Sequence, residues 1–210
     1  MGNYVITIGR EFGSGGYDIG HSLSKKLGVK CYDKELLSMA AKESGLCKEI
    51  FENHDEKPTN SFLYSLVMDT YSVSGYTSAP FLDMPLNHKV FLAQFDSIKN
   101  LASKESCIIV GRCADYALSD HKNCLNVFVH ADKEFRTVRV MESFKVSRDK
   151  AKEMIHKTDK KRASYYNYYS SKKWGDSRNF HLTLDSGVLS PEGCVEMILK
   201  YMEIKKMSSK

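Results

Sequence analysis

The fold is decided by one N-terminal stretch, Val5-Ile6-Thr7-Ile8-Gly9-Arg10-Glu11-Phe12-Gly13-Ser14-Gly15-Gly16. Its apolar, β-branched beginning predicts a buried strand, and its glycines predict a tight turn. Beyond it, Ile19, Leu23 and Leu27 recur at the spacing of one helix face. Glycines let successive backbone amides converge on one point, and the helix directs its positive N-terminal end there. The order of strand, glycine turn and helix therefore predicts a phosphate-binding turn.

The letters of the standard P-loop are largely missing from this turn. The pattern G-x-x-x-x-G-K-[ST], laid on residues 10–17, agrees only at Gly15. Arg10 replaces the first glycine, Gly16 replaces the lysine and Tyr17 replaces the hydroxyl residue. The turn thus has the architecture of a phosphate cradle without the usual lysine.

A dinucleotide-binding turn is the second pattern to compare. G-x-G-x-x-G fails because Asp18 stands where the third glycine belongs. The spacing Gly9-x-x-x-Gly13-x-Gly15 does suit a looser Rossmann-type turn. An ordinary strand-to-helix connection is the remaining alternative, although it rarely needs four glycines in eight residues, as residues 9–16 have.

The composition is that of one globular domain. The chain has 210 residues, and 42% of them are hydrophobic. No secretory signal is visible, and no apolar stretch approaches the roughly 20 residues of a membrane span, so we expect a cytoplasmic protein. The six cysteines are scattered, which favours reduced thiols over a zinc site or a disulfide framework. The net charge of +5 is compatible with a polyanionic ligand.

Strand and helix patterns alternate along the chain. Strands are predicted to begin near residues 4, 30, 107, 125 and 181. This order predicts an α/β fold with a mostly parallel five-stranded sheet and helices on both faces. Residues 48–86 carry three prolines and little periodicity, so we expect helix fragments and a long excursion there. Ser190 and Pro191 predict the start of the last helix.

Several charged residues fall where such a fold binds ligands. Arg112 follows the third predicted strand, and ligands of open parallel sheets lie beyond the carboxyl ends of the strands. It either points toward the anion or pairs with a surface carboxylate. Asp33 follows the second strand, where a helix N-cap is the simpler interpretation. Arg136 and Arg139 share a helix face and either lean over a ligand or are solvated.

A basic segment precedes a tyrosine-rich one. Residues 157–162 include Lys157, Lys160, Lys161 and Arg162, and Tyr165-Tyr166-Asn167-Tyr168-Tyr169 follows. Such interleaving can stack nucleic-acid bases. An aromatic support for a cationic lid explains it equally well.

The chain resembles the bacterial cytidylate kinase-like family, relatives of the P-loop nucleoside monophosphate kinases. The resemblance covers nearly the whole chain. The matching segments stand in family order: residues 6–16, Tyr32-Asp33-Lys34-Glu35-Leu36, Val110-Gly111-Arg112-Cys113-Ala114-Asp115, Asp159-Lys160-Lys161-Arg162 with Tyr165-Tyr166, Trp174-Gly175-Asp176 and Leu182-Thr183-Leu184-Asp185-Ser186. It implies a P-loop kinase-type three-layer fold in a single domain over residues 1–210. Within it, residues 45–103 would form an acceptor-side helical excursion and residues 147–178 a mobile helical lid.

The resemblance also implies an activity and a set of site residues. Kinases of this type use Mg²⁺ and move the γ-phosphoryl of ATP to a nucleoside monophosphate or a similar small acceptor. The implied donor site contains Gly13, Ser14, Gly15, Gly16, Arg136 and Arg139. The implied acceptor site contains Asp33, Lys34 and Arg112. Asp159 and Arg162 would belong to the lid, and Arg112 with these two would act in catalysis. The expected partner is a small nucleotide, and neither a membrane nor a nucleic acid is expected.

The chain departs from the family pattern where the chemistry is most demanding. Gly16 stands at the lysine position of the monophosphate kinases. The missing cation could be supplied by Arg10 or by a lysine of the lid, or the protein could bind nucleotide without turning it over. We favour Arg10 because a guanidinium can reach two phosphate oxygens at once. Asp18 either holds a metal through water or complements the helix dipole. Met39 and Cys113 replace an arginine and an aspartate of true cytidylate kinases.

Two other classes of function remain as alternatives. A non-catalytic nucleotide-binding regulator, or a nucleic-acid-binding module, would explain the missing lysine and the cationic tyrosine-rich segment. A short-chain dehydrogenase would use the glycine turn for NAD(P) and Tyr168-x-x-x-Lys172 as a proton relay. The dehydrogenase leaves the arginine positions unexplained.

Overall fold

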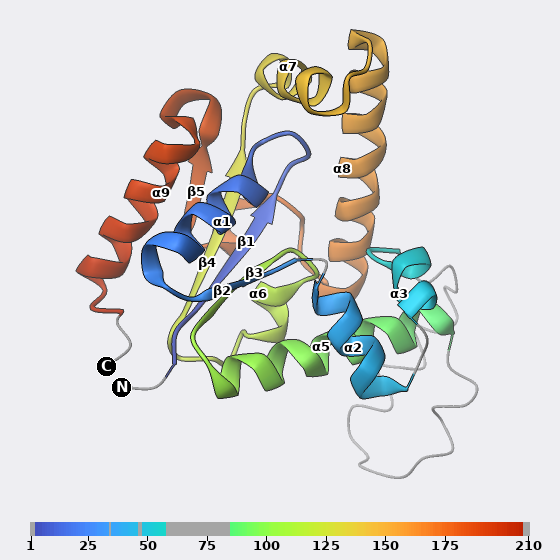
Figure 1. The fold of residues 1–210 in the computed structure, drawn as a ribbon, viewed down its shortest axis with the longest axis vertical. Helices are drawn as coiled ribbons and strands as arrows, with labels where there is room; N and C mark the ends of the chain where they lie inside the picture. Colours follow the sequence, from blue (N-terminus) through green and yellow to red (C-terminus); the bar gives the residue numbers. More distant parts are fainter. Residues whose placement is uncertain (1–2, 34, 46–47, 58–84, 208–210) are drawn as a thin grey trace.

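A five-stranded sheet forms the centre of the computed structural model, which describes residues 3–33, 35–45, 48–57 and 85–207. Its strands are β1 (Val5–Arg10), β2 (Lys30–Tyr32), β3 (Cys107–Val110), β4 (Cys124–His130) and β5 (Leu182–Asp185). Every neighbouring pair is parallel, in the order β2-β3-β1-β4-β5 (Figure 1). The predicted α/β class, the five strands and their starting points are confirmed.

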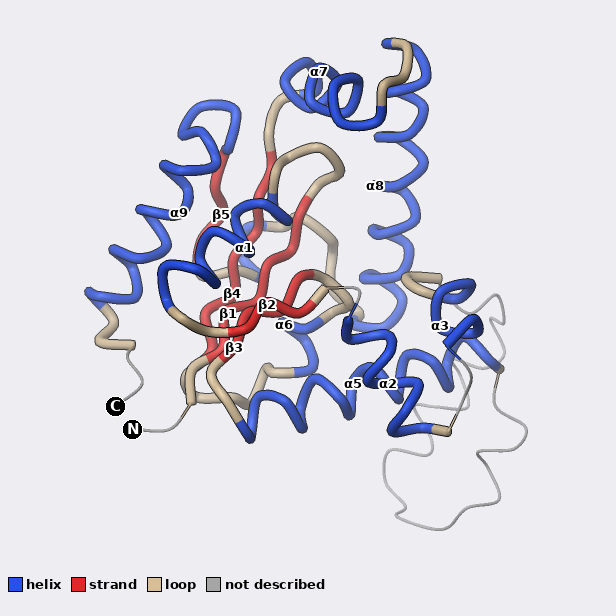
Figure 2. The backbone as a smooth tube through the Cα atoms, viewed as in Figure 1, coloured by secondary structure: helices blue, strands red, loops and turns tan. Residues whose placement is uncertain are grey.

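Helices surround the sheet along its length (Figure 2). In chain order they are α1 (Gly16–Leu27), α2 (Glu35–Ser44), α3 (Lys48–His54), α5 (Leu86–Lys104), α6 (Ala114–Ala117), α7 (Lys133–Phe144), α8 (Arg148–Ser170) and α9 (Ser186–Ile204), with a short 3-10 helix at Ser177–Asn179. Within the predicted excursion, α3 and α5 are described, and residues 58–84 lie outside the described residues.

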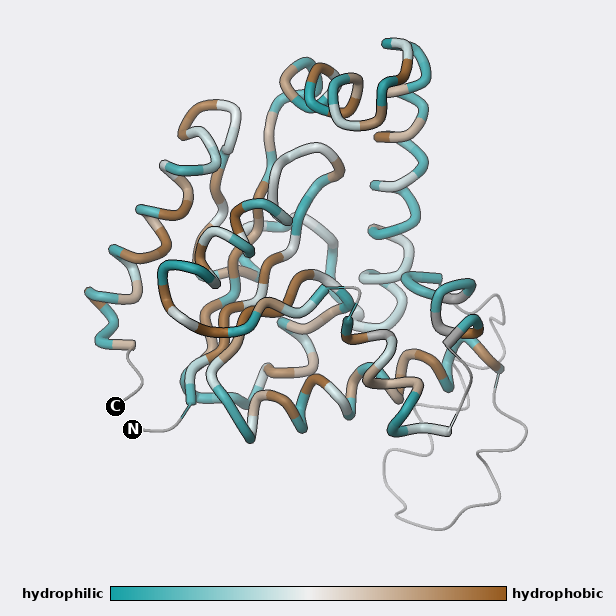
Figure 3. The backbone as a smooth tube through the Cα atoms, viewed as in Figure 1, coloured by the Kyte–Doolittle hydropathy of each residue, from teal (hydrophilic) through white to brown (hydrophobic). Residues whose placement is uncertain are grey.

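The three layers follow from the alternation of side chains along the strands. Ile6 and Ile8 of β1 face the core beneath α1 and α9, where Ile19 and Ile198 pack. The intervening strand residues point to the other face of the sheet, where they form a second core with α2, α5 and α6. This core contains Val5, Leu36, Ile98, Ile109 and Ala117. Figure 3 shows hydrophobic residues gathered along the central strands. Two buried faces explain why the strands read as nearly continuous apolar runs.

Helix α8 stands at one end of the sheet, with α7 packed against it at the top of the view (Figure 1). Ser147 caps its N-terminus by accepting a hydrogen bond from the amide of Lys150. Its C-terminal half buries three tyrosines among aromatic residues of other elements, namely Tyr165, Tyr166 and Tyr169 against Phe91 and Phe95 of α5, Trp174 and Phe180. These three rings are therefore committed to packing and are not free to stack nucleic-acid bases.

The last helix begins earlier than its sequence predicts. Asp185 caps it by accepting from the amide of Gly187, so α9 begins at Ser186 instead of Ser190. Ser190 interrupts the helix with a left-handed backbone (φ 61°), and its Oγ accepts from the amide of Gly193. The predicted serine cap is thus present, but at an internal restart. No helix of the described residues could span a membrane.

Candidate active site

The glycine turn connects β1 to α1 and lies beneath α7 and beside α8 (Figure 1). Gly13 and Gly15 adopt left-handed backbones, with φ of 83° and 81°, which glycine tolerates best. The amides of Gly13, Gly15, Gly16 and Tyr17 donate no hydrogen bond to any described residue. These amides, at the positive end of α1, form the kind of site that binds phosphate.

Ser14 supports the turn from within the protein. Its side chain is fully buried, and its Oγ donates to the carbonyl of Glu11 at 2.9 Å. Its own carbonyl accepts from Oγ of Ser186 at 2.6 Å. Because the serine hydroxyl is used inside the fold, it leaves the mouth of the turn open.

Arg10 occupies the space beside Gly16. A Cβ atom added to Gly16 would lie 2.6 Å from Cβ of Arg10, closer than such atoms approach. The guanidinium continues to Gly111, where an added Cβ would lie 2.1 Å from Nη1 of Arg10. Lysine cannot stand at position 16 while Arg10 lies there. The sequence therefore exchanges the positions of the cation and the glycine.

Glu56 joins Arg10 to Arg162 of α8. Nη1 of Arg10 donates to Oε1 of Glu56 at 3.0 Å, and Nε of Arg162 donates to Oε2 at 3.3 Å. Burial alone would raise the pKa of Glu56, but Arg10, Arg162 and Arg112 lower it below its ordinary value. Burial and the neighbouring Arg10 lower the pKa of Arg162 to about 10, so Arg162 is still charged at neutral pH.

Arg112 lies at the other end of this charge cluster. Its Nη1 donates to Asp33 at 2.7 Å, and its Nε and Nη2 donate to the two carboxylate oxygens of Asp55 at 3.2 and 3.1 Å. The Arg112 side chain is only 3% exposed. Burial lowers its pKa, but Asp55 and Asp33 outweigh burial, and its pKa is raised. Asp33 therefore uses one carboxylate oxygen for this ion pair, and no amide of the described residues donates to its side chain.

Asp159 supports the glycine turn from α8. Its Oδ1 accepts from the amide of Phe12 at 2.7 Å, and its Oδ2 accepts from Nη1 of Arg136 at 2.6 Å. Arg136 is also paired with Glu11 at 3.3 Å and is buried. Asp159 and Arg136, both predicted site residues, thus connect α8, α7 and the turn through hydrogen bonds.

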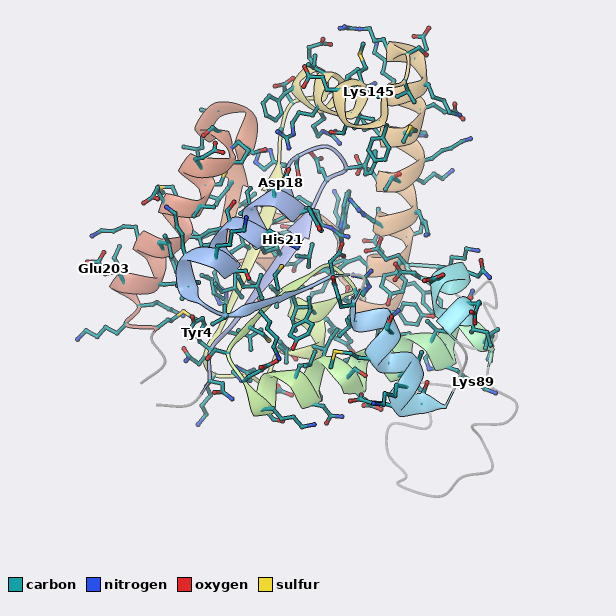
Figure 4. All side chains as sticks on the ribbon, in the orientation of Figure 1. Tyr4, Asp18, His21, Lys89, Lys145 and Glu203 are labelled. Atoms are coloured by element: carbon teal, nitrogen blue, oxygen red, sulfur yellow. The ribbon has the colours of Figure 1, made fainter. Side chains whose placement is uncertain are left out.

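Arg139 is the more exposed member of the predicted α7 pair. Its Nη2 donates to Oδ2 of Asp18 at 2.7 Å. Figure 4 shows Asp18 at the start of α1, below α7. An Asp18 carboxylate in the first turn also complements the helix dipole. No cluster of three metal-ligating side chains exists among the described residues.

A cavity of about 270 Å³ opens between these elements. The glycine turn lines one side, Arg139 and Phe144 of α7 line another, and Arg10, Arg162 and Asp33 complete the wall. The structure therefore brings together predicted residues from four distant segments. Lys34, a predicted acceptor residue, lies outside the described residues.

Sequence reasoning missed the acidic partners of the arginines. Glu56 and Asp55 stand in a charged run that follows α3, and Glu11 stands inside the turn itself. Glu56 meets residues 46 and 106 positions away in the chain. The sequence holds no signal for that contact beyond two adjacent acids, which usually lie on a solvated surface.

The parallel sheet and the turn between β1 and α1 are features of P-loop-type kinases. Two solved shikimate kinases share the fold at 12–13% identity: one from Bacteroides thetaiotaomicron (TM-score 0.52, covering 95% of this chain and 98% of that one) and one from Acinetobacter baumannii in complex with shikimate (TM-score 0.51, 99% and 97%). These similarities show the fold alone.

The family follows from a closer match. The model of the cytidylate kinase-like family matches residues 5–188, so the chain belongs to that family. An uncharacterized protein from Eubacterium ventriosum is 32% identical, with a TM-score of 0.71 over 96% of this chain and 99% of that one. A search of curated proteins found no match.

Proposed function

We propose that the protein is an ATP-dependent phosphotransferase that moves the γ-phosphoryl of ATP to a nucleoside monophosphate or a similar small acceptor. Its kinase-like family and fold support phosphoryl transfer in general. The observation that carries the specific proposal is the place of Arg10, whose side chain fills the space beside Gly16 and lines the cavity. The stem of Arg10 lies beside Gly16, where the standard P-loop has lysine, and its guanidinium lies at Gly111. This cation would take the place of the lysine.

The residues of the site fit a bound triphosphate. The amides of Gly13, Gly15 and Gly16, which have no acceptor among the described residues, would hold phosphate oxygens, and Arg10 and Arg162 would neutralise charge on the transferred group. Mg²⁺, when bound with ATP, draws charge from the phosphates and keeps several water ligands. Asp18 is a proposed outer contact to such an ion through water, for which Arg139 would have to release it.

The acceptor side supports a role for Asp33 and Arg112 that needs a rearrangement. Arg112 donates to two carboxylates and to the carbonyl of Val110, so it would have to exchange Asp55 or Asp33 for an acceptor phosphate. Met39 and Cys113 stand where true cytidylate kinases have an arginine and an aspartate. We therefore propose an acceptor other than CMP.

The direct test is to incubate the protein with Mg·ATP and a panel of acceptors and to follow ADP release. The panel contains nucleoside monophosphates and small molecules with hydroxyl or phosphate groups. We expect one acceptor to raise ADP release above that of an Arg162→Ala variant. ATP binding with no release above this control would favour the alternative, a non-catalytic nucleotide-binding regulator.

A further inference from the structure

Glu56 is a buried carboxylate between two arginines of the proposed site. Its side chain is 11% exposed, and each of its oxygens accepts a hydrogen bond from a different guanidinium. Its backbone is left-handed (φ 51°), a conformation that non-glycine residues rarely adopt. A strained backbone at a buried, doubly paired charge points to a residue held in place by its contacts.

The two guanidinium groups are close neighbours and need a shared anion. Nη1 of Arg162 donates to the carbonyl of Arg10 at 3.4 Å, and the positive charge of Arg10 lowers the pKa of Arg162. Two positive charges that contact the same buried carboxylate repel each other. Glu56 offsets the repulsion and fixes one donor of each guanidinium.

Glu56 occupies only one donor of each guanidinium, and both arginines also line the cavity. Arg10 and Arg162 line the cavity beside the glycine turn, whereas Glu56 is not among its lining residues in the described part of the chain. All three residues also line a second, smaller cavity together with Gly111 and Arg112. Nε and Nη2 of Arg10, and Nη2 of Arg162, donate to no described residue. These three groups remain available to phosphate oxygens.

We infer that Glu56 is a positioning residue for phosphoryl transfer: it aligns Arg10 and Arg162 as a pair whose remaining donors meet a phosphate bound at the glycine turn. This inference rests on the proposed function. Glu56 does not touch the transferred group; it holds the two arginines that do. Preorganised donors contribute most where charge develops in the transition state, so the alignment acts on turnover more than on ATP binding.

The kinetic test compares Glu56→Gln, Glu56→Asp and Glu153→Gln in the full-length protein. Glu153 is a matched control because it also pairs with two cations, Lys150 and Lys157, but on the exposed face of α8. We expect Glu56→Gln to lower kcat by about 100-fold while KM for ATP changes by less than about threefold. Glu56→Asp keeps the charge and should retain an intermediate kcat. Glu153→Gln should match the wild type.

Wild-type kcat in Glu56→Gln, or a higher one, would overturn the inference and make Glu56 an obstacle or a bystander. If Glu56→Gln does not fold, the kcat of Glu56→Asp decides in the same way. If the wild type turns over no acceptor, the proposed function fails, and the NMR signals of the arginine side chains still test the alignment with a non-hydrolysable ATP analogue bound. Signals of Arg10 and Arg162 broadened by faster rotation in the Glu56 variants, and not in Glu153→Gln, would support it; unchanged signals would contradict it.

Discussion

The glycine-turn side and the Arg112 side of the site use charge in opposite ways. At the turn, several backbone amides and several donors of Arg10 and Arg162 have no partner among the described residues, and the same residues line a cavity. Around Arg112, the guanidinium is buried and donates to Asp33, Asp55 and a backbone carbonyl. A donor already used inside the protein binds a ligand only by giving up that bond. A phosphate bound at the turn would therefore meet donors that have no described partner, whereas a phosphate at Arg112 would first have to displace a carboxylate.

The largest expected effect is the loss of turnover when Arg10, beside the glycine turn, is removed. Arg10→Ala should lower turnover between about 10³- and 10⁵-fold, the range seen when a transition-state arginine is removed from phosphoryl-transfer enzymes. ADP release measures it, and Arg148→Ala is the matched control because Arg148 is exposed and pairs only with Glu134 among the described residues. Turnover within a few-fold of the wild type would rule out Arg10 as the replacement for lysine.

The second-largest expected effect is a loss of stability when Arg112 is removed. Arg112→Ala leaves the carboxylates of Asp33 and Asp55 without their buried partner, which should lower the free energy of unfolding by about 3–5 kcal/mol. Denaturant unfolding measures this loss. An unchanged free energy of unfolding combined with lost turnover would instead make Arg112 a ligand-binding group.

An exchange of the residues at positions 10 and 16 tests whether Arg10 replaces the P-loop lysine. Gly16→Lys alone should abolish turnover because its Cβ would collide with Arg10. The double variant Arg10→Gly, Gly16→Lys restores the usual arrangement of cation and glycine and should recover part of the activity, by at least about tenfold over Gly16→Lys. Gly193→Ala controls for the loss of a glycine, since its backbone is not left-handed and an added Cβ there comes no closer than 3.4 Å to a neighbouring atom. No recovery in the double variant would show that Arg10 acts by another route.

The pH dependence of the free energy of unfolding tests whether Glu56 is ionised and paired with the arginines. Its pKa is lowered in the folded protein below the ordinary value of 4.5, so its ion pairs stabilise the protein above that pH and this stabilisation is lost as the pH falls through the folded-state pKa. The difference in the free energy of unfolding between the wild type and Glu56→Gln should be largest at neutral pH and should narrow below pH 4.5. A constant difference between pH 7 and pH 3 would contradict the ion-paired state.

The smallest effect belongs to the exposed pair of Arg139 and Asp18. Their side chains are 30% and 56% exposed, so solvent screens the interaction. Arg139→Ala should change the free energy of unfolding by less than about 1 kcal/mol. Thermal unfolding tests this expectation; a loss above about 2 kcal/mol would mean that the pair is a structural part of the turn.

The sequence predicted the frame of the site better than its contacts. The strands and the glycine turn were predictable because apolar runs and glycines act through local backbone chemistry, as at Gly13 and Gly15. The caps at Asp132 and Ser147 follow from the same local rules. The partners of Arg10 and Arg112 were not predictable, because Glu56 and Asp55 reach them only after the chain has folded. The break at Ser190 also escaped prediction, since Asp185 supplies a second, earlier cap.

The most direct test of the account is a crystal structure with Mg²⁺ and a non-hydrolysable ATP analogue. We expect Nε or Nη2 of Arg10 to lie within hydrogen-bond distance, about 3 Å, of a phosphate oxygen held by the amides of the glycine turn. Nη1 of Arg10 should remain bonded to Glu56. A triphosphate bound away from the turn, or Arg10 directed into solvent while the nucleotide is bound, would contradict the account.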